Sequence, residues 1–224
     1  MPNQTPAPTA PAADTFKRWT ETERQKSLES ALAHWSEGQD VWIFGYGSLI
    51  WRPEFDFTES RMAKLDNHHR ALCLWSRINR GTPEVPGLVF GLEHGGEGCG
   101  GMVFRIPAVK VRETFSTVWV REMSTGAYHP NWLECETEQG KVSALTFIIN
   151  QQASSYVPEP HPDELVKIVH RATGIYGSCY DYVMQTAIAL KQAGICDQRL
   201  AILAEQLEKH REALAQSNSS TNQT

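Results

Sequence analysis

The sequence predicts an α+β protein, with its strands in the first two thirds of the chain and most of its helices at the end. Short segments rich in β-branched and aromatic residues, separated by Gly, Pro, Asn and Asp, fill the region 40–150. From residue 162 onward, apolar residues recur with helical spacing instead. Hydrophobic residues make up 41% and charged residues 21% of the 224, which is typical of one soluble globular domain.

Six strands are expected before residue 150, and one helix interrupts them. This helix should run from about Pro107 to Trp119, because proline suits a first helical position. Val111, Phe115 and Val118 then form a single apolar face. The expected strands are VWIF (41–44), RALCLW (70–75), GLVFGLE (87–93), GGMVFRI (100–106), WLECET (132–137) and VSALTFIIN (142–150).

Three helices should follow, and disordered tails should flank the folded part. Gly194 is expected to end the second of these helices and Asp197 to cap the third. The three helical segments are 162–173, 180–194 and 197–216. The expected division of the chain is a Pro- and Ala-rich disordered tail at 1–14, a helical extension at 15–37, the main domain at 38–214 and a polar disordered tail at 215–224.

Charge and composition exclude several classes of function. A formal net charge of −5 disfavours nucleic-acid binding through phosphate contacts. No apolar run approaches the roughly 20 residues of a membrane helix, and the N-terminus lacks the features of a signal peptide. We therefore expect a cytoplasmic protein with no membrane partner. The five cysteines are widely spaced and never form C-x-x-C, so buried reduced thiols are expected and no metal site.

The stretch VWIFGYGSLIW (41–51) carries the first functional signal, a loop with two glycines after an apolar strand. A dinucleotide fingerprint would need a third glycine where Ile50 stands. A nucleophile elbow around Ser48 would need glycines where Tyr46 and Ile50 stand. Two interpretations stay open. The loop either forms a nest of backbone N–H groups that binds an anion, with the Ser48 hydroxyl as a further donor, or it is a tight turn whose glycines avoid a clash.

Glu122 is the second signal, because it continues the apolar stripe of the 107–119 helix. A carboxylate at the C-terminal end of a helix opposes the helix dipole, so helix stability does not explain it. Burial would raise its pKa and let it exchange protons near neutral pH. The alternative is that Glu122 turns outward or pairs with Arg80, Arg105 or Arg121. Tyr128 follows closely and could line the same cleft.

These features together resemble the ChaC branch of the γ-glutamylcyclotransferases. The matching segments are VWIFGYGSLIW (41–51), NRGTPEVPG (79–87), WVREMSTGAY (119–128) and GSCYDYV (177–183), and the resemblance covers about 40 to 210. In the last segment the family's usual asparagine is Cys179 and the leucine after the tyrosine is Val183. The Cys179 change puts in doubt how that helix begins.

The resemblance implies a small mixed β-barrel flanked by helices, with no metal and no cofactor. It implies cleavage of the γ-glutamyl bond of glutathione into 5-oxoproline and Cys-Gly, with Glu122 as the catalytic general acid and base. Arg80 is a weaker candidate for steering the anionic substrate, and a structural ion pair is its alternative. The implied substrate-binding residues are Ile43, Phe44, Gly45, Tyr46, Gly47, Ser48, Leu49, Arg80, Tyr128 and Tyr182.

Attack by the substrate's own α-amine needs no protein nucleophile, which agrees with the failed elbow pattern at Ser48. Three alternatives remain. The first is a sister enzyme that cyclises other γ-glutamyl amines or amino acids. The second is a non-catalytic γ-glutamyl-binding module, which the retained Glu122 disfavours. The third is a regulator of cation transport, which the lack of a membrane segment disfavours. The sequence does not indicate an oligomeric state.

Overall fold

A computed structural model of the chain describes Ala10 and residues 18–221, apart from the side chains of 218–221. The expected tail at 1–14 lies outside the described residues except for Ala10, and so does the start of the expected helical extension. Within 15–37 the structure contains helix α1 (Glu21–Leu32). A capping box begins this helix, since Thr20 accepts from the N–H of Glu23 and the Glu23 carboxylate accepts from the N–H of Thr20.

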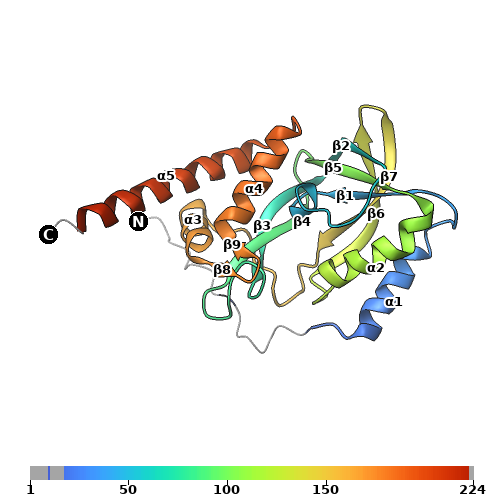
Figure 1. Ribbon diagram of the computed structural model, residues 1–224, viewed down its shortest axis with the longest axis horizontal. Helices are drawn as coiled ribbons and strands as arrows, with labels where there is room; N and C mark the ends of the chain where they lie inside the picture. Colours follow the sequence, from blue (N-terminus) through green and yellow to red (C-terminus); the bar gives the residue numbers. More distant parts are fainter. Residues whose placement is uncertain (1–9, 11–17, 222–224) are drawn as a thin grey trace.

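A closed five-stranded barrel forms the centre of the molecule, in the order β1-β5-β2-β6-β7 (Figure 1). Strand β1 (Val41–Gly45) runs antiparallel to β5 (Cys99–Ile106) and parallel to β7 (Gly140–Ile149). Strands β2 (Glu59–Leu65) and β6 (Tyr128–Thr137) complete the ring. The predicted mixed barrel is confirmed.

Strand β2 is the barrel strand that the sequence reading missed. Its residues, ESRMAKL, include Glu, Lys, Ala and Met, which are not typical strand formers. The side chains of Ala63 and Leu65 are buried, whereas most of the others face outward. Continuous antiparallel pairing with β5, from Glu59 opposite Arg105 to Leu65 opposite Cys99, forms the strand despite its composition.

Outside the barrel, β3 (His68–Ser76) and β4 (Gly87–His94) form a separate two-stranded sheet. Both strands are buried along almost their whole length, which agrees with the apolar runs ALCLW (71–75) and LVFGL (88–92) at their centres. Strand β4 contacts β7, so this sheet packs against the barrel. It brings Phe90 toward the same region as Tyr182.

The interrupting helix is present, but it begins and ends later than expected. Pro107 is extended, and the N–H of Lys110 donates to its carbonyl to form the short helix η3 (Ala108–Lys110). Helix α2 (Val111–Glu122) follows directly. Its predicted face is confirmed, because Val111, Phe115 and Val118 are buried. Helix α1 packs against α2 on one side of the barrel (Figure 1).

Helices α3 (Pro162–Arg171), α4 (Cys179–Gln192) and α5 (Gln198–Thr221) gather on the other side (Figure 1). Helices α3 and α4 contact β4, and α5 packs against α3 and α4. Between α3 and α4 lies a short hairpin of β8 (Thr173–Gly174) and β9 (Gly177–Ser178).

Both predicted helix-end signals are confirmed. Gly194 has a left-handed φ of +73° after α4, and the Asp197 carboxylate accepts from the N–H of Leu200 at 3.0 Å.

The C-terminal segment differs from the expected tail at 215–224. Helix α5 continues through Thr221, and residues 222–224 lie outside the described part. Ser and Asn are mediocre helix formers. However, a helix that packing has already nucleated adds further residues at little cost. The earlier part of α5 supplies that packing through Leu200, Leu203 and Leu207, which are buried.

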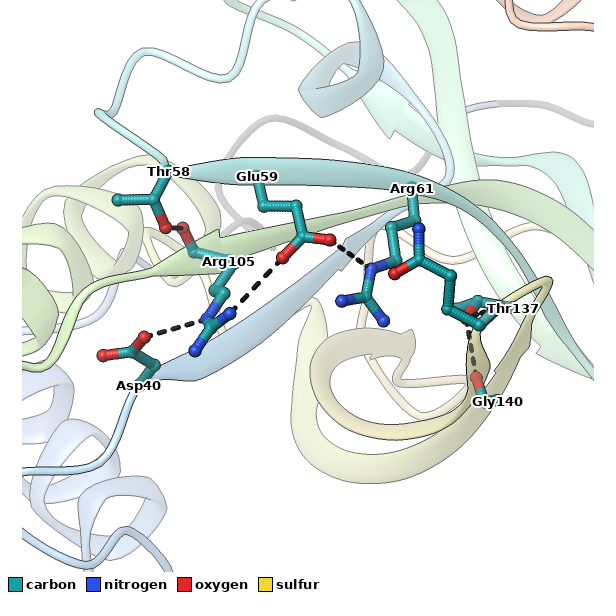
Figure 2. A network of polar contacts seen from close by, with 8 residues as sticks. Asp40, Thr58, Glu59, Arg61, Arg105, Thr137 and Gly140 are labelled. Atoms are coloured by element: carbon teal, nitrogen blue, oxygen red, sulfur yellow. Dashed lines mark hydrogen bonds and ion pairs between the residues drawn. The ribbon is translucent and has the colours of Figure 1, made fainter.

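An ion-pair chain lies on the outside of the barrel, across β2 and β5 (Figure 2). The Arg105 Nε donates to Asp40 at 2.8 Å, and its Nη1 lies 3.4 Å from Glu59. Glu59 also accepts from Arg61 at 2.6 Å. Arg105 therefore joins carboxylates on the barrel surface and is not the partner of Glu122.

Candidate active site

The glycine loop leaves β1 at Gly45 and turns into the short helix η2 (Ser48–Ile50). Among the described residues, no acceptor is found for the backbone N–H groups of Gly47, Ser48 and Leu49. The Arg70 guanidinium fixes the loop to β5, because it donates to the carbonyl of Tyr46 in the loop and to the carbonyl of Gly100 in β5. A fixed loop with several free N–H groups at a helix start can bind an oxygen anion.

The two glycines are required for close approach and not for a left-handed backbone, since neither has a positive φ. A Cβ at Gly45 would lie 2.9 Å from the Cβ of Leu49. A Cβ at Gly47 would lie 3.3 Å from the hydroxyl oxygen of Tyr182. The glycines thus avoid clashes, as the tight-turn interpretation expects. The free N–H groups could still bind an anion, as the nest interpretation expects.

Glu122 is the last residue of α2, and its side chain is 17% exposed. Burial raises the pKa of this carboxyl above its ordinary value. The charge of Arg121 opposes that rise, and the charge of Glu54 adds to it. Of the arginines considered from the sequence, Arg121 is the one that pairs with Glu122, with its Nε 3.1 Å from Oε1. Glu122 is therefore both partly buried and paired.

Three buried tyrosines lie within electrostatic range of this carboxyl, and backbone groups anchor their hydroxyls. Tyr46 donates to the carbonyl of Phe147 at 2.7 Å, and Tyr128 donates to the carbonyl of Phe90 at 3.0 Å. Tyr182 accepts from the N–H of Phe90 at 3.1 Å. Burial raises the pKa of all three phenols, and the Glu122 charge contributes to each rise. The structure thus brings the loop, Glu122, Tyr128 and Tyr182 into one electrostatic neighbourhood.

Arg80 is buried, and the ion pair considered from the sequence is not found. Within the described part of the chain, no carboxylate lies within ion-pair distance of its guanidinium. Its Nη1 donates to the carbonyls of Tyr176 and Ser178, and its Cζ lies 5.2 Å from the Tyr182 ring centroid. Burial lowers its pKa from the ordinary value. A buried cation without a counter-ion favours an anionic ligand.

The apolar members of the predicted set, Ile43, Phe44 and Leu49, are buried core residues. Ile43 and Phe44 pair with Phe104 and Val103 of β5. These side chains hold the strand that carries the loop, so any contact with a ligand would come from the backbone.

Arg121 was missed as a site residue, except as one alternative partner of Glu122. Its Nη2 donates to the Ser48 hydroxyl at 2.7 Å, so it joins the loop to the carboxyl. Adjacent helix residues point in different directions, so nothing in the sequence pattern indicated that Arg121 would join Glu122 to Ser48.

Cys179 begins α4 without disturbing it. The Cys179 thiol donates to the carbonyl of Leu88 at 3.0 Å, and its sulfur lies 3.4 Å from the N–H of the same residue. The thiol thus provides both a donor and an acceptor to β4, as an asparagine side chain could. Ser178 caps the helix by accepting from the N–H of Asp181 at 2.9 Å. The doubt about this helix start is resolved.

Two open hollows lie on the surface, and neither is lined by Glu122 or the loop. Within residues 18–221, no group of three or more His, Cys, Asp or Glu side chains is arranged to hold a metal ion. No helix in the described part of the chain has the length and apolar character to cross a membrane. The first hollow is lined by Glu54, Phe55, Asp56, Lys110, Glu113, Thr114 and Thr117, and the second by Gly38, Gln39, Asp40, Trp42, Arg61, Arg105 and Val142.

The closed barrel and its flanking helices form the γ-glutamylcyclotransferase fold. A solved yeast γ-glutamyl cyclotransferase specific to glutathione superposes with a TM-score of 0.71 at 22% identity, covering 76% of this chain and 96% of the yeast chain. The family model described as ChaC-like protein matches residues 41–210. The chain therefore belongs to the ChaC-like family. The match begins at the first residue of β1 and leaves out α1.

Curated relatives in this family carry a specific name. The glutathione-specific γ-glutamylcyclotransferase of Escherichia coli K12 is 33% identical over 192 residues, which cover 85% of this chain and 83% of the relative. Glutathione-specific γ-glutamylcyclotransferase 1 of Mus musculus is 28% identical over 172 residues, covering 74% and 77%.

Proposed function

We propose that this protein is a glutathione-specific γ-glutamylcyclotransferase. The names of its relatives support this function, together with their similarity over most of both chains. The observation that carries the proposal is the partly buried carboxyl of Glu122, with its raised pKa, beside a loop that has free N–H donors. This combination provides a proton acceptor next to a group that can bind oxygen atoms.

The reaction requires two proton transfers at one place. Glu122 takes a proton from the substrate α-ammonium, and the resulting amine attacks the γ-carbonyl carbon. The five-membered ring closes, the amide bond to cysteine breaks as Glu122 returns its proton to the departing nitrogen, and the ring nitrogen loses its second proton to solvent to leave the neutral lactam. The products are 5-oxoproline and Cys-Gly. Acid–base assistance of this kind contributes about 10²–10⁴-fold, and a raised pKa suits a group that must accept a proton and then release it.

The loop would hold the γ-glutamyl group through the N–H groups of Gly47, Ser48 and Leu49. Their acceptor would be either the α-carboxylate or the carbonyl oxygen that becomes negatively charged. Tyr128 and Tyr182 would line the same site. Fixing the γ-glutamyl chain in a folded form contributes further, because effective molarities of well-oriented groups reach about 10⁵–10⁸ M.

Arg80 would attract a carboxylate of glutathione. Its buried guanidinium has no protein counter-ion among the described residues, so an incoming carboxylate would offset part of the cost of burying it. Glutathione carries two carboxylates. This role therefore agrees with an anionic peptide substrate.

The test is to incubate the purified protein with glutathione and, separately, with γ-Glu-Ala, and to measure 5-oxoproline. We expect product from glutathione alone, and we expect Glu122→Gln to lose nearly all of it. Glu113→Gln is the matched control, because Glu113 is an exposed carboxylate on the same helix. Near wild-type turnover by Glu122→Gln would contradict the mechanism.

The same assay separates the alternatives. Product from both substrates would indicate a sister enzyme with a broader leaving-group site. Binding of glutathione without product would indicate a non-catalytic module. A cytoplasmic location and the absence of a nucleic-acid partner remain predictions from the sequence, and so does the division into an extension and a main domain at residue 38.

A further inference from the structure

Arg121 and Glu122 form an ion pair although they are neighbours on one helix. Side chains at i and i+1 of a helix point about 100° apart, so such neighbours do not normally face each other. Here the Arg121 Nε nevertheless lies 3.1 Å from the Glu122 carboxylate. Some contact outside the helix must therefore pull the guanidinium toward Glu122.

The structure shows those outside contacts. The Nη2 of Arg121 donates to the Ser48 hydroxyl at 2.7 Å. Its Nη1 donates to the carbonyl of Arg52 at 2.7 Å and to the carboxylate of Glu54 at 3.0 Å. All three nitrogens of one planar group are thus engaged with separate partners. A lysine could not reproduce this arrangement, since it offers a single point charge.

Glu54 is itself held in an unusual conformation. Its φ is +59°, a left-handed value that residues other than glycine rarely adopt. Arg52 fixes its carboxylate from the other side, with Nε 2.8 Å from Oε1. Such backbone strain persists where surrounding contacts over-determine it, and it is often found at functional sites. Here it aims the Glu54 carboxylate at Arg121.

We propose that Arg121 is a positioning residue that fixes the Glu122 carboxylate relative to the glycine loop, and that Glu54 holds Arg121 in place. The proposal rests on the proposed function, because it assigns Glu122 the proton transfers and the loop the binding of substrate. Arg121 need not touch the substrate. It acts through Glu122 on one side and through Ser48 on the other.

This arrangement also sets an electrostatic balance at Glu122. Arg121 favours the charged carboxylate, whereas Glu54 disfavours it. The other titratable groups facing Glu122 are the phenols of Tyr46, Tyr128 and Tyr182, which come from the loop, β6 and α4. Burial raises the pKa of these phenols, so they stay neutral in the pH range where Glu122 titrates. Arg121 and Glu54 are therefore the two charges that a pH profile should report.

The test compares Arg121→Met, Arg121→Lys and Glu54→Gln with wild type. The first readout is the ¹³C shift of the Glu122 carboxyl against pH, assigned by its disappearance in Glu122→Gln. We expect its midpoint to rise in Arg121→Met, which removes the positive charge. We expect it to fall in Glu54→Gln, which removes the negative charge but keeps a side-chain oxygen that can still accept from Arg121. Midpoints that do not move in either variant would overturn the proposal.

The second readout is the pH dependence of kcat/KM for 5-oxoproline formation from glutathione. We expect its acidic limb to shift in the same two directions. For Arg121→Met we also expect kcat/KM to fall by about 10²-fold, the cost of a misplaced catalytic group. Arg121→Lys should keep the midpoint near that of wild type, because it keeps the positive charge. It should recover only part of kcat/KM, because an ammonium group cannot spread its N–H donors over three nitrogens as the planar guanidinium does. Full recovery by lysine would contradict a positioning role.

Controls separate this proposal from the proposed function. Arg112→Met removes an exposed arginine from the same helix and should leave both readouts unchanged. Circular dichroism and thermal unfolding check that each variant is folded. If wild type forms no 5-oxoproline while the ¹³C midpoints shift as expected, the proposed function fails and the positioning of Glu122 stands. If glutathione is turned over but the midpoints do not move, the positioning proposal fails and the function stands.

Discussion

At the scale of single residues, the carboxyl of Glu122 is in an environment that disfavours its charge. Its raised pKa means that the folded protein prefers the protonated acid more strongly than the unfolded chain does. The stability that this preference contributes is fully present below the unfolded pKa of about 4.3. It is lost as the pH rises through the folded pKa. At neutral pH the charged form therefore lowers the free energy of unfolding.

Glu122→Gln should consequently be at least as stable as wild type at neutral pH, in addition to losing activity. Glutamine resembles the protonated acid at every pH and can still accept from Arg121. We expect the two proteins to have equal stability below about pH 4.3, and the variant to gain as the pH rises toward the folded pKa of Glu122. Urea unfolding at several pH values measures the difference. The quantity compared is the free energy of unfolding of the variant minus that of wild type. A difference that becomes smaller as the pH rises from acid to neutral would contradict this account.

At the scale of elements, two glycines close the loop that carries Arg80. A Cβ at Gly81 would lie 2.2 Å from the backbone nitrogen of Gly87. A Cβ at Gly87 would lie 2.1 Å from the carbonyl oxygen of Arg80. Real Cβ atoms do not approach other atoms this closely, so the segment can fold back on itself only with glycine at both positions. The fold of this segment thus sets the position of the buried guanidinium.

Gly87→Ala should therefore act on both stability and substrate affinity. The new methyl group must push the Arg80 backbone aside, which costs about 1–3 kcal/mol in a well-packed region. Because Arg80 moves, we also expect KM for glutathione to rise more than kcat falls. Urea unfolding and steady-state kinetics measure the two effects. Unchanged values of both would show that the segment can relax without moving Arg80.

The helices and strands were largely predictable from the sequence, whereas the pairing that closes the strands into a barrel was not. Val111, Phe115 and Val118 define a helical stripe that points to Glu122, because helical periodicity is a local property. Strand β2 was missed because its composition is polar and its pairing with β5 is non-local. The contact between Arg121 and Ser48 could not be predicted for the same reason. It joins residues that only the closed fold brings together.

At the scale of the whole molecule, α1 braces the helix that ends in Glu122, although it lies outside the family match. The Trp119 indole donates to the Ser27 hydroxyl at 3.2 Å, and the Trp132 indole donates to the carbonyl of Ala31 at 3.1 Å. Leu28 and Leu32 are buried in the same core cluster as Phe115 and Trp119. The extension is therefore part of the packed structure.

Leu32→Ala should test that bracing. Removing a buried leucine typically costs about 2–5 kcal/mol, and we expect the lower half of this range because α1 is at the surface of the fold. Glu29→Ala changes an exposed position on the same helix and should have little effect. Urea unfolding measures both variants. Equal stability of Leu32→Ala and wild type would show that α1 does not contribute to the fold.

The thiol that replaces asparagine at the start of α4 has a consequence for redox chemistry. Burial raises the pKa of Cys179 to about 12, and it raises the pKa of Cys135 to about 12 as well. Thiol–disulfide exchange requires a thiolate and access, and these buried cysteines offer neither at neutral pH. An enzyme whose substrate is itself a thiol, and which encounters the disulfide of that substrate, would otherwise risk forming mixed disulfides. Of the five cysteines only Cys196 is exposed, so such exchange is confined to a site at the end of the loop before α5.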